Sequence, residues 1–168
     1  MPQPNDYVAK RSDLEELMRQ LPGFRGYLDR DCRRESDELL RNWMADRLER
    51  SKRAIDELAR RLADAAAIDL LPMIDRLRVR LDRLLARIRG AMQGYSGLFD
   101  LVAIDAPLLD RVYEHDAQLG QQVDAFTALA EQLRQPNSAP ATIAELLRQS
   151  DEIERQWDGR EEILKGVK

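Results

Sequence analysis

Three stretches of this chain repeat apolar residues in alternating steps of three and four, and this pattern restricts the fold more than any other feature. The first covers about residues 28–67 without a glycine or proline, and the others cover about 70–92 and 106–135. Such spacing places the apolar side chains on one face of a helix, and its regularity is typical of left-handed bundles. In the first stretch this face comprises Leu40, Met44, Leu48, Ser51, Ile55, Leu58, Leu62 and Ala65.

Weaker patterns add a short helix at 12–20 and a fourth long helix at 141–164, after a loose N-terminus at 1–9. The inward face of the fourth helix is predicted to hold Ile143, Leu146, Ser150, Ile153, Trp157 and Leu164. The chain has 168 residues, which suits one domain with a sizeable core. We therefore predict an all-α fold, an elongated antiparallel bundle of three to four long helices with a short N-terminal helix, forming a single domain over 1–168.

Pro72 leaves two arrangements open for the first two long helices. They can form a hairpin, with Pro72 in the first turn of the second helix, or one rod kinked at Pro72. A solitary rod would leave both apolar faces in water, which favours the hairpin. Because the first helix is longer than the second and overhangs it, residues 94–105 are expected to pack as an extended loop along its base.

Two glycine-rich segments share the form Gly-aromatic-x-Gly, one at 23–26 and one at 94–97. In an up-and-down bundle both fall toward the same end. Their glycines are suited to turns and helix ends, and their aromatic side chains can either plug the end of the bundle or bind a partner. The residues concerned are Phe24, Arg25, Tyr27, Tyr95, Leu98, Phe99 and Asp100.

These segments also carry a resemblance. The chain resembles a family of small, uncharacterised bacterial helical proteins over roughly residues 20–135. His115 departs from the family pattern, which has a bulky apolar residue there. The resemblance implies one structural unit and no activity, and it rests on residues 22–27, 33–37, 94–100 and 109–116.

Catalytic and metal chemistry find little support in the sequence. His115 is the single histidine, so it is the one candidate base for a nucleophilic pair. The Glu-x-x-His pairs of di-iron bundles and the glycine-rich phosphate loops do not occur. We predict a protein that is not an enzyme and needs no cofactor or metal.

Asp116 occupies a position on the apolar face of the third helix. A buried carboxylate without a partner is costly, so we expect it to be buried and paired with an arginine of the first or second helix. The pair either fixes the packing of the helices or serves as a functional acid. The candidate partners are Arg34, Arg41 and Arg87.

Charge is distributed unevenly along the chain. Residues 1–90 carry 20 basic and 17 acidic side chains, which gives this part a net charge of +3. Residues 91–168 carry 7 basic and 14 acidic side chains, which gives a net charge of −7. Either acidic and basic helices lie side by side, or the basic surface meets a partner. An anionic membrane is one such partner for the outer face of the second helix, which presents Arg76, Arg80, Arg83 and Arg87.

The function favoured by these patterns is a non-enzymatic protein-interaction or scaffold module that associates with itself and with a protein partner. The alternative is a peripheral membrane or envelope-associated factor. The net charge of −4 argues against nucleic-acid binding. Cys32 is the only cysteine and no apolar run is long enough for a bilayer, which favours the cytoplasm.

Overall fold

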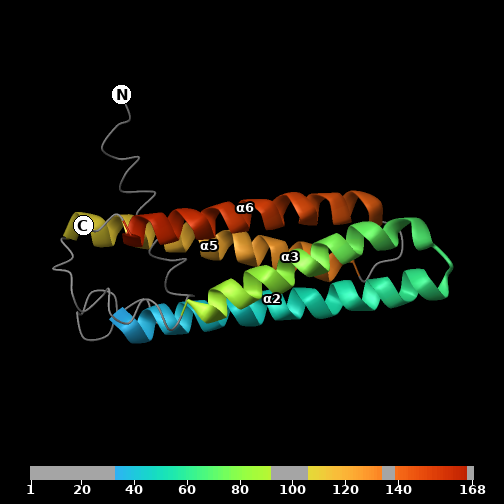
Figure 1. The fold of residues 1–168 in the computed structure, drawn as a ribbon, viewed down its shortest axis with the longest axis horizontal. Coiled ribbons are helices and arrows are strands. Elements are labelled where there is room, and N and C mark those ends of the chain that lie inside the picture. The colour runs from blue at the N-terminus through green and yellow to red at the C-terminus, as the bar shows by residue number, and fades with distance from the viewer. Residues whose placement is uncertain (1–32, 92–105, 134–138, 166–168) are drawn as a thin grey trace, which may run out of the picture.

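The computed structural model describes residues 33–91, 106–133 and 139–165, and within these ranges the chain is helical apart from short turns (Figure 1). Four long helices, α2 (Arg33–Asp64), α3 (Leu71–Gly90), α5 (Ala106–Gln132) and α6 (Ala139–Lys165), account for most of it, with a single 3-10 turn, η3 (Ile68–Leu70). The predicted all-α fold is confirmed.

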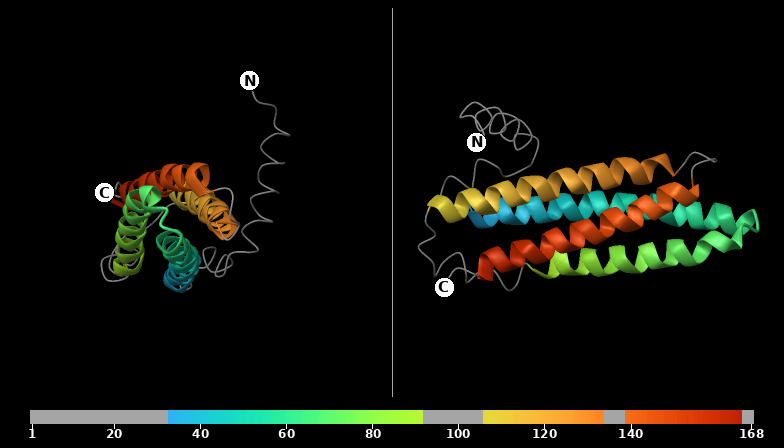
Figure 2. Two further views of the ribbon diagram at one scale, coloured as in Figure 1. Left: turned by 90° about the vertical axis from the view of Figure 1, so that its right-hand side faces the viewer. Right: turned by 90° about the horizontal axis from the view of Figure 1, so that it is seen from above.

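The helices form a four-membered bundle in which each long helix packs against two others. α2 packs on α3 and α5, and α6 packs on the same two helices. α2 and α5 run in one direction, and α3 and α6 return in the other (Figures 1 and 2). The bundle is therefore two antiparallel hairpins, α2–α3 and α5–α6, laid side by side.

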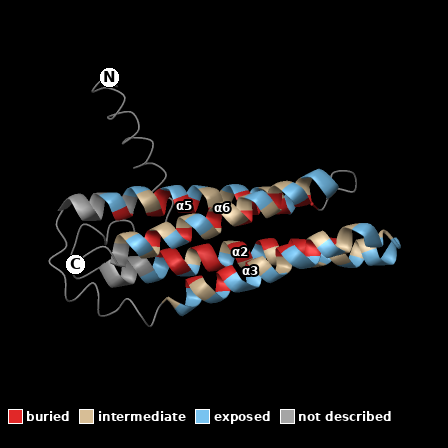
Figure 3. Ribbon diagram, turned by 45° about the horizontal axis from the view of Figure 1, so that its top comes forward, coloured by how far each residue is buried: buried red, intermediate tan, exposed pale blue. Residues whose placement is uncertain are grey.

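Burial follows the apolar repeat seen in the sequence. Buried residues lie where the helices face one another (Figure 3). Aromatic and aliphatic side chains from all four helices meet there, and burying each one contributes roughly 1.5–3 kcal/mol. The fully enclosed members include Met44, Leu48, Ile55, Ile74, Leu77, Leu81, Ile88, Leu119, Val123, Phe126, Ile143, Leu146 and Trp157.

The connection between α2 and α3 is a tight turn, so the predicted hairpin is confirmed and the kinked rod is wrong. The Ala67 amide donates to the Leu62 carbonyl at 2.9 Å, and the Ala66 amide donates to the Ala63 carbonyl at 3.0 Å. This is the Schellman pattern that ends a helix, with Ala66 in the left-handed conformation at φ 55°. Helix α2 therefore stops at Asp64 rather than at 67.

The other predicted boundaries lie close to the observed ones. Helix α3 starts at Leu71 with Pro72 in its first turn, where proline loses no helical hydrogen bond. Helix α5 ends at Gln132, three residues before the predicted end. The expected loose N-terminus, short helix and packed loop, together with the start proposed at residue 28, lie outside the described residues.

The turn that joins α2 to α3 projects beyond the ends of α5 and α6 (Figures 1 and 2). Where α5 ends, Arg61 of α2 donates from Nη2 to the Leu133 carbonyl at 2.6 Å. The apolar face of α2 loses cover at this contact: Leu58, which precedes it, is buried, whereas Leu62 is half-buried and the predicted face residue Ala65 is exposed. Ala65 lies after the last residue of α2, so the turn carries it out of register with the core.

Candidate functional site

Asp116 is buried and paired, as expected from its place on an apolar face. Its side chain and that of Arg160 are 3% and 1% exposed. Arg160 donates from Nε to Oδ1 at 2.7 Å and from Nη2 to Oδ2 at 3.2 Å, which is a bidentate ion pair.

The partner in this pair comes from α6, so the prediction of an arginine from the first or second helix missed the helix that supplies it. Arg41 is buried on α2, the side chain of Arg34 lies outside the described residues, and Arg87 pairs elsewhere. A sequence signal for Arg160 existed. It continues the three-four spacing of Ile153, Trp157 and Leu164, at a position where an apolar residue is expected.

The surroundings of the Asp116–Arg160 pair account for the positions of His115 and Gly159. The Arg160 guanidinium carbon lies 5.4 Å from the centre of the Trp157 ring, so the buried cation also contacts an aromatic face. His115, one residue before Asp116, places Nε2 2.6 Å from the Gln156 carbonyl, and this nitrogen must donate to it. A methyl group at Gly159 would lie 3.3 Å from His115 Cε1, so this glycine makes room for the imidazole within a continuous helix.

A second buried polar contact joins α2 to α5. The Ser51 hydroxyl lies 3.2 Å from the Thr127 hydroxyl, and both side chains are buried. Ser51 can donate to Thr127, which in turn donates to the Val123 carbonyl at 2.9 Å, and the Ser51 oxygen also lies 3.0 Å from the Arg47 carbonyl on its own helix. Ser51, a small polar residue on the predicted apolar face, thus serves the close approach of α2 to α5 within one chain.

The arginine-rich face of α3 is largely engaged by acidic side chains of α6. Arg80 pairs with Asp151, and Arg83 lies 3.4 Å from Glu154. Arg87 pairs with Asp158 and also faces the carboxylates of Glu154 and Glu161. The uneven charge of the sequence is thus used to hold basic α3 beside acidic α6.

The carboxylates of α6 stabilise the charged form of Arg87. Burial lowers its pKa, but the hydrogen bond that Arg87 donates to Asp158 and the nearby carboxylates raise the pKa by more, so the net shift is upward. Of the four arginines proposed to face lipid, Arg80, Arg83 and Arg87 pair with carboxylates of α6. Arg76 is exposed, and among the described residues it has no ion-pair partner.

On the opposite side, α2 and α3 are bridged by a ladder of ion pairs that stops before their connection. Its rungs join Arg89 to Glu49 at 3.4 Å, Lys52 to Asp82, and Arg78 to Asp56 at 2.6 Å. The hydrogen bond to Asp82 raises the pKa of Lys52, so this rung stays charged.

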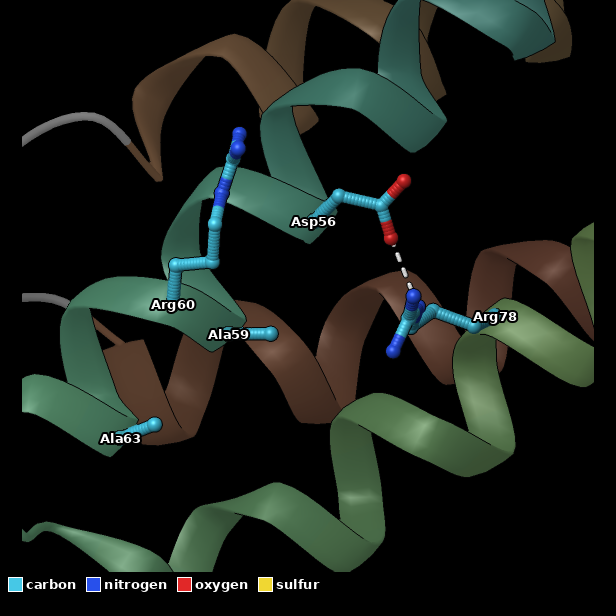
Figure 4. Close-up of a pocket in the computed structure, with 5 residues that line it drawn as sticks. All are labelled: Asp56, Ala59, Arg60, Ala63 and Arg78. Carbon is cyan, nitrogen blue, oxygen red and sulfur yellow. Dashed lines mark ion pairs between the residues drawn. The ribbon is translucent and has the colours of Figure 1, made fainter.

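Beyond the last rung an open groove separates the two helices (Figure 4). Its floor is formed by Ala59 and Ala63, whose methyl groups point toward α3, and its edges are formed by Asp56, Arg60 and Arg78. The apolar pattern does not indicate this groove, because two alanines on a helix interrupt no periodicity. It lies on the outer side of the α2–α3 hairpin, with α5 and α6 behind it (Figure 4).

The remaining predicted site residues cannot be placed. Phe24, Arg25, Tyr27, Tyr95 and the segment 98–100 lie outside the described residues. Within residues 33–91, 106–133 and 139–165, no group of three or more His, Cys, Asp or Glu side chains is arranged to hold a metal ion. None of the helices in that part of the chain is both long enough and apolar enough to cross a bilayer.

Comparisons of this chain with protein-family models, with curated proteins and with solved structures found no match.

Proposed function

We propose that this protein is a non-enzymatic interaction or scaffold module that associates with itself. The observation that supports this most directly is the surface of the α2–α3 hairpin that α5 and α6 leave uncovered. It presents an open groove on its outer side and, in the projecting turn, an aliphatic side chain, Ile68, that is 64% exposed. A second copy or a protein partner would cover surface that α5 and α6 do not reach.

The chemistry of the described polar groups fits a structural role. Asp116 and Arg160 neutralise each other in the core, and His115 uses its Nε2 proton to bind a backbone carbonyl. A catalytic base must be free to reach a proton on its substrate. The polar groups that the structure pairs hold helices together instead.

The membrane alternative gains no support from the arginines of α3. Arg80, Arg83 and Arg87 face carboxylates of α6, so binding anionic lipid through them would require those ion pairs to separate. Co-sedimentation with anionic vesicles at low salt is the measurement that would favour it.

Self-association is tested by measuring the mass of the full chain by light scattering over a concentration series up to ~100 µM, which is enough to detect a dissociation constant in the micromolar range. The expected result is a mass that rises from one copy to two. A single-copy mass throughout the series would overturn self-association as the function.

A further inference from the structure

The charges around the groove between α2 and α3 include both signs. Asp56 is already engaged by Arg78, and this pair forms one end of the groove (Figure 4). Arg60, one turn later, and Asp64, one turn later still, are both exposed. The described residues give neither of these two an ion-pair partner, so a cation and an anion stand four residues apart on the same outer face of α2.

We propose that the groove is the surface through which a second copy of this chain docks. In the resulting dimer the two α2 helices cross antiparallel near residue 62, and each one lies over the groove of the other copy. This arrangement puts Arg60 of each copy beside Asp64 of the other, giving two equivalent ion pairs. The inference rests on the proposed self-association and assigns a surface to it.

The charge pattern favours a second copy over another kind of partner. A two-fold interface brings one patch against itself, so the patch must be complementary to its own reversed image. A base at 60 and an acid at 64 meet that requirement when the helices cross antiparallel near residue 62, because each base then faces the acid of the other copy. A uniformly acidic or uniformly basic partner would instead meet a like charge at one of these positions.

The floor of the groove fits the same arrangement. Helix axes approach to about 8 Å only where the side chains between them are small. Ala59 and Ala63 are the side chains that α2 points into the groove, and neither would have to move when a second helix lies across it. Bulky or long side chains at these positions would hold the two copies apart.

The experiment compares full-length variants by sedimentation velocity over a concentration series, with circular dichroism to confirm that each one is folded. Arg60→Glu and Asp64→Arg each place like charges in contact twice per dimer, and each is expected to weaken association about tenfold or more. The combined Arg60→Glu/Asp64→Arg variant restores opposite charges and is expected to return to within about threefold of the parent.

Two further variants separate the groove from general effects of charge. Ala63→Gln fills the groove without changing the charge and is expected to weaken association. Arg53→Glu makes the same charge change as Arg60→Glu two turns earlier, on an exposed position of α2, and is expected to leave association unchanged.

The outcomes distinguish this inference from the function on which it rests. A parent protein that stays monomeric overturns self-association itself, and the groove assignment with it. A parent that dimerises with the same affinity after Arg60→Glu and Ala63→Gln overturns the groove assignment and leaves self-association standing. Loss in the single variants and recovery in the charge-exchanged variant supports the proposed crossing.

Discussion

Removing the carboxylate of Asp116 is the most informative perturbation of the core. Replacement by alanine leaves the Arg160 guanidinium, 1% exposed, without the two hydrogen bonds of 2.7 and 3.2 Å that now neutralise it. Breaking a buried ion pair from one side costs about 3–5 kcal/mol, because the remaining charge stays in a poorly solvating environment. For a chain of this size the melting temperature should fall by roughly 6–20 °C.

The assay is chemical denaturation and calorimetry of the Asp116→Ala variant beside two matched variants. Arg160→Met removes the cation and strands the carboxylate, so it should cost a similar amount. Asp116→Leu combined with Arg160→Met removes both charges, and apolar replacement of a buried pair is commonly neutral or stabilising by ~1–4 kcal/mol. The double variant should therefore be more stable than either single variant.

Two results would refute this reasoning. If Asp116→Ala costs less than about 1 kcal/mol, the carboxylate contributes no more than an ordinary surface ion pair. If the double variant is no more stable than Asp116→Ala and Arg160→Met, removing the second charge brings no compensation, and the two side chains are not coupled through each other. Either result would mean that the Asp116–Arg160 contact does not hold α5 against α6.

Three further changes test local features by thermal unfolding. Gly159→Ala should stabilise the helix by about 1 kcal/mol in a His115→Ala background. In the parent the gain should be smaller, because the added methyl group lies 3.3 Å from the imidazole, and equal effects in the two backgrounds would contradict that contact. Ala66→Gly should raise the melting temperature by a few degrees. It relieves a left-handed conformation that costs an L-residue ~1–2 kcal/mol, and this exceeds the ~0.4–1 kcal/mol lost to the greater freedom of glycine in the unfolded chain. A lower melting temperature would contradict this reasoning. Ser51→Leu should destabilise by about 1–3 kcal/mol and by more than Ser51→Ala, because it overpacks the approach to Thr127; the reverse order would show spare room there.

The architecture was predictable because the apolar repeat is nearly uninterrupted. The three-four spacing on each helix identifies the residues that are buried, and the short connections specify antiparallel order. The end of α2 was less predictable, because its Schellman turn uses Ala66 where a glycine would be the usual signal. A run of alanines reads as more helix, and this is why α2 was predicted to continue to residue 67.

The polar contacts were predictable only in part. Asp116 is identifiable because an acid stands on an apolar face, and Arg160 meets the same criterion as a base on the apolar face of α6, next to Trp157. The pairing of α3 arginines with α6 carboxylates depends on which helices are neighbours across the bundle, and periodicity carries no information on that. The groove could not be predicted, because it depends on where a ladder of ion pairs ends.

The two buried polar contacts also explain why these helices settle in one register. Apolar layers of leucine, isoleucine and valine repeat every seven residues, so sliding α5 by one repeat along α6 would still bury apolar surface. Such a slide would place Asp116 against Ile153 instead of Arg160, which leaves a carboxylate unpaired in the core at a cost of several kcal/mol. Sliding α5 along α2 would separate Thr127 from Ser51 and bring bulkier residues into a close approach. Buried polar residues fix the register of helices in other helical bundles. Here the Asp116–Arg160 pair fixes α5 against α6, and the Thr127–Ser51 contact fixes it against α2. The α2–α3 hairpin, and the groove on its outer side, therefore keep a fixed position relative to the rest of the bundle, as a docking surface requires.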